Sequence, residues 1–538
     1  MRRFITRLVP VIVLAVSVSF SAPAPAGARQ SAGAPRVRFA GVRMKASPVG
    51  VDASTRRVNL PTDPRSTVVA AKTSAMDVAP AAARSSVAPS TQAPVLGTGF
   101  EAEPDGSPLV SPSDPTGAVG TTDVMAAANV HVGVFDRSGT QLVPPQRLRS
   151  VAGLSSYADT DPKVVYDPSK GGWFVLSFIA YTNTQVRIVV MTVPETQVAD
   201  TSAWCSTIFN GDQVKGDGHQ FSDYDTLGFS DNRVTVATNN FNWQGTTFQY
   251  AQVISMKKSQ LYDVTCSKPV HLTVLAGGAT RNPDGSKGAT LQPAVPTEVV
   301  TGMPQYLTSF ARRNGKGEVV LWRLKETSHG LRLSNAAMRV GHTAFAPWGL
   351  QGGGSTGDPH TWWDTGDLRL INASYDPATG FIYTANAVAH DFAPSARVES
   401  AVRWYEVQPT GSLPNSAVTR DGYVGQSGSD AAWPSVATDG DGKLYVNYSQ
   451  ASLANAEFLS IHAATVPVGS TVATSVLVKA GEARYAFPVP GPQRWGDYSA
   501  IERDPADPTQ MYAFNAYALD GGSTTQLWQE WAQVLTDA

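Results

Sequence analysis

The sequence predicts an all-β chain folded as a seven-bladed β-propeller, and three observations support that prediction. One pattern of strands occurs seven times between about residue 120 and the C-terminus, and repeats of this kind are typical of propellers and solenoids. The strands alternate with turns rich in Asp, Gly and Pro, and no long segment has helical periodicity. The repeated part is about 440 residues long, which exceeds the usual domain size but suits a ring of blades that pack on one another. Seven copies favour seven blades and leave six or eight open.

Each repeat begins with a short apolar strand that follows Asp or Trp. We expect these first strands at 115–120, 162–167, 225–230, 296–300, 367–376, 434–439 and 499–504. The second strands are rich in aromatic residues and lie at 123–130, 172–180, 233–241, 303–311, 380–388, 443–451 and 510–518. The third strands lie at 131–136, 187–193, 248–255, 318–324, 400–407, 458–466 and 525–534. Their alternation and their β-branched and aromatic residues are typical of short antiparallel strands.

The turns between first and second strands repeat one composition. Asp-Pro or Asp-Gly recurs there, as in Asp439-Gly440 and Asp504-Pro505, and these residues favour tight turns for steric reasons. We expect the ring to close by pairing a strand near 97–103 with the C-terminal strand over 528–534, because this pairing removes an open sheet edge.

The N-terminus predicts export. Met1-Arg2-Arg3 precedes an apolar run over 8–20, and Ala26-Gly27-Ala28 fits the small-x-small cleavage rule. We therefore expect residues 1–28 to be a signal peptide and the mature protein to be secreted. The apolar run is too short to span a bilayer, and no other run of about 18 apolar residues occurs, so no membrane span is expected.

Residues 29–95 differ in composition from the predicted propeller domain at 96–538. They are rich in Ala, Pro, Ser and Arg, which predicts a disordered linker or pro-segment that buries too little apolar surface to offset its ordering entropy. This segment has 10 Lys and Arg against 3 Asp and Glu, whereas the propeller domain has 29 against 41. An acidic body argues against a nucleic-acid-binding protein. We expect a monomer.

The chain has two cysteines, Cys205 and Cys266. In an exported protein the default expectation is a disulfide between them. They flank the third repeat, so we expect the bond to fix the two ends of that blade.

Four segments resemble a known group of proteins. They read GTGFEA (97–102), SDPTGAVG (113–120), DYDTLGFSDNRVTVATNNF (223–241) and RWGDYSAIERDP (494–505). These segments resemble a family of secreted bacterial β-propellers, sialidase-like in general fold and mostly without assigned function, and the resemblance covers 97–538. It implies the fold and brings no settled activity. Sialidases carry Ser-x-Asp-x-Gly-x-Thr-Trp boxes, and the absence of a clean box here disfavours sialidase activity.

In a propeller, residues at the start of each innermost strand face one mouth of the central channel, where several loops converge on a concave surface. We expect Asp225, Asp367 and Asp497 at this mouth as candidate catalytic residues, because paired carboxylates can act as acid and base at a glycosidic bond. Candidate ligand-binding residues nearby are His219, Asp223, His360, Trp363, Asp364, Arg369, Trp433, Arg494 and Trp495. An Asp before a strand also commonly stabilises a turn, so a scaffold role stays open for each of these acids and for the equivalent Asp114 and Asp161.

No cofactor is predicted, although the acidic ring leaves a structural Ca²⁺ open. Asp439-Gly440-Asp441-Gly442 resembles the start of a calcium loop but lacks the Glu that such a loop needs, so a plain turn is favoured.

Two functions remain open. The first is a secreted glycan-directed protein that binds an extracellular polysaccharide at the channel mouth and, if it is an enzyme, is a glycoside hydrolase. The alternative is a non-catalytic surface or interaction platform that binds a protein partner. Two unpaired carboxylates facing each other across a pocket would favour the glycan-directed protein, whereas carboxylates paired with arginines or backbone amides would favour the platform.

Overall fold

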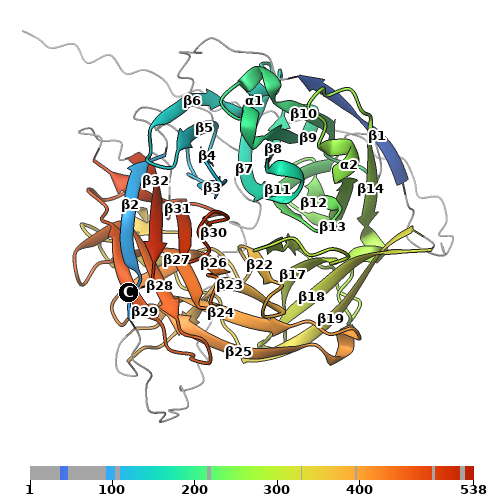
Figure 1. Ribbon diagram of the computed structural model, residues 1–538. Coiled ribbons are helices and arrows are strands. Elements are labelled where there is room, and N and C mark those ends of the chain that lie inside the picture. Colours follow the sequence, from blue (N-terminus) through green and yellow to red (C-terminus); the bar gives the residue numbers. More distant parts are fainter. Residues whose placement is uncertain are drawn as a thin grey trace, which may run out of the picture.

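The computed structural model describes residues 37–45, 92–102, 110–214, 220–328, 330–393, 397–487, 491–520 and 527–537. Within these ranges the chain is almost entirely β, and seven four-stranded antiparallel blades surround a central channel (Figure 1). The predicted seven-bladed β-propeller is confirmed. In the same ranges no helix is long and apolar enough to cross a membrane.

The blades follow one another along the chain. Blade 1 contains β3 (Thr116–Val119), β4 (Asp123–Ala128), β5 (His131–Asp136) and β6 (Gln141–Arg147). Blade 2 contains β7 (Ala158–Asp167), β8 (Trp173–Tyr181), β9 (Val186–Pro194) and β10 (Cys205–Asn210). Blade 3 contains β11 (Gln220–Phe229), β12 (Arg233–Asn242), β13 (Phe248–Lys257) and β14 (Val270–Ala276). Blade 4 contains β15 (Gln292–Pro293), β17 (Gln305–Arg313), β18 (Lys316–Thr327) and β19 (Gly330–His342).

The remaining three blades complete the ring. Blade 5 contains β22 (Ala373–Asp376), β23 (Phe381–His390), β24 (Glu399–Gln408) and β25 (Ala417–Val424). Blade 6 contains β26 (Asp430–Thr438), β27 (Leu444–Ser452), β28 (Glu457–Val466) and β29 (Thr474–Lys479). Blade 7 contains β30 (Ala500–Arg503), β31 (Gln510–Leu519), β32 (Leu527–Thr536) and β2 (Val95–Glu101). Two short helices, α1 (Leu148–Val151) and α2 (Lys258–Leu261), lie between strands of blades 1 to 3.

The first strand of each repeat is the innermost strand of its blade, as predicted, and these strands surround the channel (Figure 1). Blade 4 differs from the prediction of 296–300, because its innermost strand is the very short β15. The neighbouring β16 (Val295–Pro296) pairs in parallel with β22 of blade 5 instead. Pro293 and Pro296 have no backbone N–H to donate, and proline therefore keeps this inner segment short.

The N- and C-terminal parts of the propeller close the ring within blade 7. β2 is antiparallel to β32, with Phe100 opposite Ala532 and Val95 opposite Thr536 (Figure 1). This confirms the predicted closure between 97–103 and the C-terminal strand. The last blade is therefore built from both ends of the domain, and β32 has a partner on each side.

A strand also forms inside the segment expected to be a linker. β1 (Val37–Lys45) lies between β10 and β14 and is antiparallel to both, so that blades 2 and 3 form one nine-stranded sheet (Figure 1). The composition of residues 29–95 gives no sign of this pairing.

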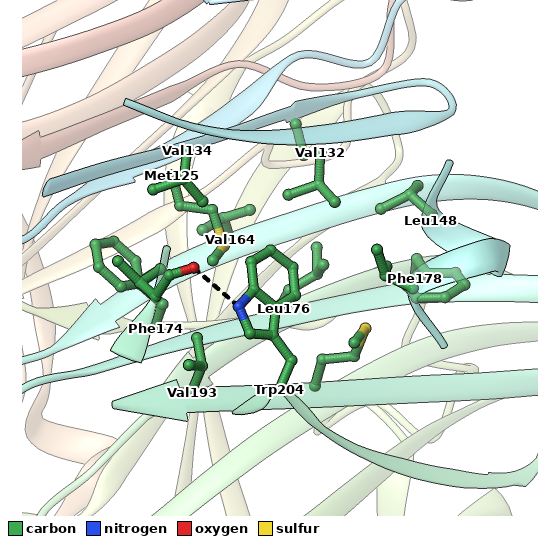
Figure 2. Packing of buried hydrophobic residues seen from close by; sticks show 14 of the residues in the cluster. Met125, Val132, Val134, Leu148, Val164, Phe174, Leu176, Phe178, Val193 and Trp204 are labelled. Carbon is green, nitrogen blue, oxygen red and sulfur yellow. Dashed lines mark hydrogen bonds between the residues drawn. The ribbon is translucent and has the colours of Figure 1, made fainter. Parts of the chain in front are cut away.

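Neighbouring blades are held together by apolar side chains between their faces. Figure 2 shows one such cluster, in which blade 1 contributes Met125, Val132 and Val134 and blade 2 contributes Val164, Leu176, Phe178 and Trp204. The Trp204 indole N–H donates to the Val198 carbonyl at 3.0 Å, so this large side chain is buried without an unpaired polar atom. Strand alternation places one face of each blade against the next.

The predicted disulfide between Cys205 and Cys266 is confirmed. Its position corrects the expectation that it fixes one blade. Cys205 begins β10, the outer strand of blade 2, and Cys266 lies in the connection between β13 and β14 of blade 3. The bond therefore joins two neighbouring blades.

Candidate binding site at the channel mouth

The backbone is irregular in the same way at the start of several inner strands, and this irregularity shapes the mouth. The left-handed backbone conformation occurs at Asp114, Asp161, Tyr224 and Trp433, with φ between 48° and 57°. In β7, β11 and β26 the strand register shifts at this point, as at a β-bulge that redirects a side chain. Asp tolerates this conformation better than most residues, which gives Asp114 and Asp161 a scaffold role. Tyr224 and Trp433 are bulky residues there and carry backbone strain.

Two buried tyrosines cross the axis directly below the mouth. The Tyr224 hydroxyl of blade 3 donates to the backbone carbonyl of Asp497, which precedes blade 7, at 3.1 Å. The Tyr498 hydroxyl donates to the carboxylate of Asp161 in blade 2, also at 3.1 Å. The two rings are 4.7 Å apart, and each residue is 1% exposed. Tyr224 belongs to blade 3 and Tyr498 precedes the first strand of blade 7, and blades 3 and 7 are not neighbours in the ring. The two side chains therefore lie across the channel, and we call them the tyrosine plug.

Two of the three candidate catalytic acids are held in ion pairs. Asp367 accepts two hydrogen bonds of 2.8 Å from the Arg369 guanidinium, and that guanidinium also lies 4.5 Å from the centre of the Tyr224 ring. Asp497 accepts a hydrogen bond of 2.5 Å from Arg494. Each carboxylate is therefore neutralised by an arginine three residues away or less.

The third candidate, Asp225, lies within the protein and not on the surface of the mouth. It is fully buried, and one carboxylate oxygen accepts from the Ser177 hydroxyl at 2.5 Å. The other oxygen, Oδ1, has no hydrogen-bond partner among the described residues. Burial raises the pKa of Asp225 well above its usual value, and the charge of Asp161 raises it further.

Asp114 and Asp161 complete a buried acidic group below the mouth. Asp114 accepts from the Asn129 side-chain amide at 2.6 Å and from the backbone N–H of Asp497 at 2.7 Å. Asp161 accepts from Thr160 at 2.5 Å and from the tyrosine plug. Burial raises the pKa of both carboxyl groups, and the neighbouring Asp497 adds to the effect.

Three tryptophans predicted to bind ligand lie in the core. Trp363, Trp433 and Trp495 are at most 3% exposed and belong to one apolar cluster. The indole N–H of Trp433 donates to the Asp364 carbonyl at 2.9 Å, and that of Trp495 donates to the Ser449 hydroxyl at 3.0 Å. Their faces are covered by other side chains, so they cannot stack on a sugar ring as the sequence suggested.

The loop that contains Asp364 and the loop that contains Gln493 are hydrogen-bonded to each other at the mouth, although they are far apart in the sequence. The backbone N–H of Asp364 donates to the Gln493 carbonyl, and the N–H of Gln493 donates to the Trp362 carbonyl, both at 2.8 Å. His360, in the same loop, is exposed and accepts from the backbone N–H of Gly491 at 3.1 Å. This pairing brings the loop with Asp367 and Arg369 together with the loop that carries Arg494 and Asp497. His219 lies outside the described residues.

A group of partly exposed aromatic residues lies at the mouth beside blades 2 and 3. Tyr181 ends β8, Phe221 lies near the start of β11, and Trp243 follows β12. Their rings are in edge contact, at 5.8 Å between Tyr181 and Phe221 and 6.2 Å between Phe221 and Trp243. We call these three residues the aromatic rim. The half-buried Asp223 is two residues from Phe221. Burial raises the pKa of Tyr181, and the charges of Asp159, Asp161 and Asp223 add to this effect.

The sequence does not single out the three residues of the aromatic rim, because they resemble the ordinary strand residues of the repeat. The sequence signal was Trp243, an aromatic residue at a turn in a position that strand packing does not require. Among the residues that the structure describes, no group of three or more His, Cys, Asp or Glu is placed to hold a metal ion. The structural Ca²⁺ that the sequence leaves open therefore has no support in that part of the chain.

Comparison with known proteins places the chain in no family. No family model matches it, and no curated protein matches it. A protein of unknown function from Dyadobacter fermentans is similar over 71% of this chain and 95% of its own, with 11% identity and a TM-score of 0.33. Trypanosoma rangeli sialidase in complex with sialic acid is similar over 77% of this chain and 59% of its own, with 10% identity and a TM-score of 0.34. An α-L-arabinofuranosidase from Fusarium graminearum is similar over 83% and 98%, with 8% identity and a TM-score of 0.35. Similarity at this level assigns no function.

Proposed function

We propose that this chain is an exported β-propeller that binds an extracellular polysaccharide at the mouth of its channel and does not cleave it. The observation that carries the proposal is the aromatic rim of Tyr181, Phe221 and Trp243, which lies beside charged side chains on the same mouth. A sugar ring presents an apolar C–H face and hydroxyl groups at its edge. Partly exposed aromatic rings suit the first, and fixed polar groups suit the second.

The arrangement of the acids supports binding over hydrolysis. A glycosidase needs one carboxyl group to protonate the leaving oxygen and a second to attack or activate water. Asp367 and Asp497 are paired with arginines, and Asp225 is buried below the surface. The hydrogen-bonding capacity of these carboxylates is thus taken up by arginines and not turned toward a substrate.

Pairing of Asp367 and Asp497 with arginines argues against hydrolysis and, taken alone, favours the protein-binding platform; the aromatic rim is the observation that favours a sugar ligand. Arg–Asp pairs present both donors and acceptors to either kind of ligand. The aromatic rim favours the sugar because it is small. It offers three adjacent rings, whereas a stable protein interface requires about 800 Å² on each partner.

The test uses the full chain purified from culture medium and a panel of neutral and acidic polysaccharides in affinity gel electrophoresis, with calcium and with chelator. We expect at least one polysaccharide to retard the wild type and Trp243→Ala to weaken that binding at least tenfold, or about 1.4 kcal/mol. Trp531→Ala is the matched control, because Trp531 is a half-buried tryptophan on the outer strands of blade 7. Wild type that no polysaccharide retards, or equal binding by both variants, would overturn the proposal and leave the protein-binding platform.

A further inference from the structure

A lysine and an aspartate form a completely buried ion pair between blades 2 and 3. Nζ of Lys258 lies 2.6 Å from Oδ2 of Asp167, and both side chains are fully buried. Lys258 belongs to α2, which follows β13 of blade 3, and Asp167 ends β7 of blade 2. Six residues of β7 separate Asp167 from Asp161 at the mouth, which corresponds to about 20 Å along a strand. The pair therefore lies away from the mouth and does not depend on the function proposed above.

The short helix α2 explains how the lysine enters the protein. Lys257 and Lys258 are consecutive, and Lys257 is exposed whereas Lys258 begins a single buried turn. The backbone N–H of Tyr262 donates to the Lys258 carbonyl at 2.7 Å, so the two side chains are one turn apart on the same face. The Tyr262 hydroxyl accordingly reaches the ion pair and donates to Oδ2 of Asp167 at 2.5 Å.

Apolar and aromatic side chains surround the pair. The centre of the Phe229 ring is 4.7 Å from Nζ of Lys258, and the Trp173 ring is stacked on Tyr262 at 4.7 Å. These three aromatic residues belong to one buried apolar cluster. Burial lowers the pKa of Lys258, although the charge of Asp167 opposes this shift. The surroundings therefore favour the free amine, which is the nucleophilic form of lysine.

Within the described residues, the other lysine–carboxylate pairs are partly exposed. The side chains of Lys443–Asp537 and Lys479–Glu482 are between 19% and 48% exposed, so water solvates their charges. Two charges withdrawn from water carry a desolvation cost that their attraction only partly offsets. Replacement of the buried pair by a neutral amide would remove this cost, and the water that is released would leave the protein interior.

The repeat provides an internal comparison for Asp167. Asp167, Asp376 and Asp504 lie at the ends of inner strands in blades 2, 5 and 7, and each accepts from a backbone N–H two residues further on. Asp376 and Asp504 are paired with arginines, Arg503 and Arg137. A guanidinium stays protonated in proteins and has no free electron pair with which to attack a carboxyl group. Of these three equivalent aspartates, only Asp167 faces a lysine.

The two oxygens of Asp167 have the partners that amide formation requires. Oδ1 accepts from the backbone N–H of Ser169 at 3.0 Å, and this donor can stabilise charge that develops on Oδ1. Oδ2 accepts from both Lys258 and Tyr262, so it is the oxygen that can be protonated and leave. The amine already touches the carboxyl group, so no entropy is lost in bringing the reacting groups together.

We propose that Lys258 and Asp167 condense after folding to form an isopeptide bond that joins blades 2 and 3. The Nζ–Cγ bond forms and the Cγ–Oδ2 bond breaks. Of the three protons of the ammonium group, one stays on the amide nitrogen and two leave with Oδ2 as water, one of them relayed by the Tyr262 hydroxyl. The positive and the negative charge cancel, and no oxidant or other reactant is consumed. The ordinary alternative is a permanent buried ion pair.

The test is the intact mass of the full chain, purified from culture medium and denatured, with its N-terminus determined in the same sample. We expect the wild type to be lighter than the disulfide-bonded sequence by one water molecule. A tryptic digest should contain a branched peptide that includes Asp167 and Lys258. Lys258→Arg keeps the charge but cannot form the bond, and it should have the full mass. Lys443→Met is the matched control, because the pair of Lys443 with Asp537 is exposed, and it should lose water like the wild type.

A second variant guards against misfolding of Lys258→Arg. Tyr262→Phe leaves the lysine and the aspartate in place and removes only the hydroxyl that donates to Oδ2. We expect its water loss, followed by mass over time after synthesis, to be at least tenfold slower than that of the wild type. Wild type of full mass, or Lys258→Arg that still loses water, would overturn the proposal. Tyr262→Phe that condenses as fast as the wild type would overturn the proton relay assigned to this hydroxyl.

Discussion

The hydroxyl of Tyr498 and the carboxylate of Asp161 are 3.1 Å apart and hydrogen-bonded, although they belong to blades 7 and 2. Blade 1 lies between these blades in the ring, so the bond crosses the end of the channel. With the bond from Tyr224 of blade 3 to the Asp497 carbonyl, it ties three blades together at one point. The two bonds therefore fix these three blades relative to one another at this end of the channel.

The substitution Tyr498→Phe tests how much the Tyr498–Asp161 hydrogen bond contributes to stability. The change keeps the ring that packs on Tyr224 and removes one donor from a buried carboxylate, whose desolvation is then less well compensated. We expect the free energy of unfolding to fall by about 1.5–3 kcal/mol, as for other hydrogen bonds to charged groups, in chemical denaturation at pH 7.

Tyr512→Phe is the matched control for this measurement. Tyr512 is also a buried tyrosine of blade 7, and its hydroxyl has no hydrogen bond among the described residues. We expect a change of less than about 0.5 kcal/mol there. Equal effects of the two substitutions would show that the bond to Asp161 contributes nothing to stability.

A second prediction concerns the protonation of Lys163. Its pKa is lowered from 10.5 to about 8 by burial, so between these two values the unfolded chain holds a proton that the folded protein has released. Stability from this group is therefore lowest below pH 8 and rises as the pH increases from 8 toward 10.5. NMR of ¹³C-methylated lysines should show one resonance that titrates near pH 8 and is absent from Lys163→Met.

The variant Asp225→Asn provides a second test of the Lys163 pKa. The charge of Asp225 is the largest effect that supports the protonated form of Lys163, so its removal should move the titration below pH 8. A Lys163 resonance that titrates near pH 10.5, or that does not move in the variant, would contradict the burial of Lys163 or the effect of Asp225 on it.

The repeated strands were predictable because each blade meets the same physical demand. An inner strand packed between two neighbours must be apolar, and the hairpin after it needs Asp, Pro or Gly, as at Asp504-Pro505. The closing strand at Val95–Glu101 was predictable for a similar reason, since a ring of blades leaves one outer edge to be paired. The brief β15 was not, because prolines break the pattern that strand prediction depends on.

The candidate site was less predictable because burial cannot be read from residue type. Trp363 and Trp495 look like surface platforms in sequence, but they fill the space where loops meet the blades. The tyrosine plug depends on contacts between residues 337 positions apart. Lys163 carried a local signal that the strand pattern concealed, because a lysine inside an inner strand of apolar residues, PKVVYD, calls for a polar environment.

A third prediction concerns the disulfide. Cys205 and Cys266 are 61 residues apart and join blades 2 and 3, so the bond restricts the unfolded chain over most of blade 3. We expect the double variant Cys205→Ala, Cys266→Ala to lose about 2–4 kcal/mol in free energy of unfolding. Reductant should destabilise the wild type to the same level and leave the double variant unchanged. A wild type that reductant does not affect would indicate that the bond contributes little.

The last prediction concerns closure of the ring by β2. Deletion of residues 92–102 removes the strand that pairs with β32 and takes Phe100 away from Phe135, whose ring lies 5.3 Å from it. Blade 7 would then have three strands and an open edge on β32, and such an edge pairs readily with other chains. We expect a lower melting temperature and concentration-dependent association in analytical ultracentrifugation. Deletion of the eleven residues 71–81, within the expected linker, is the control of equal length and should leave both properties unchanged. A monomer of unchanged melting temperature after deletion of 92–102 would mean that the ring is stable without its closing strand.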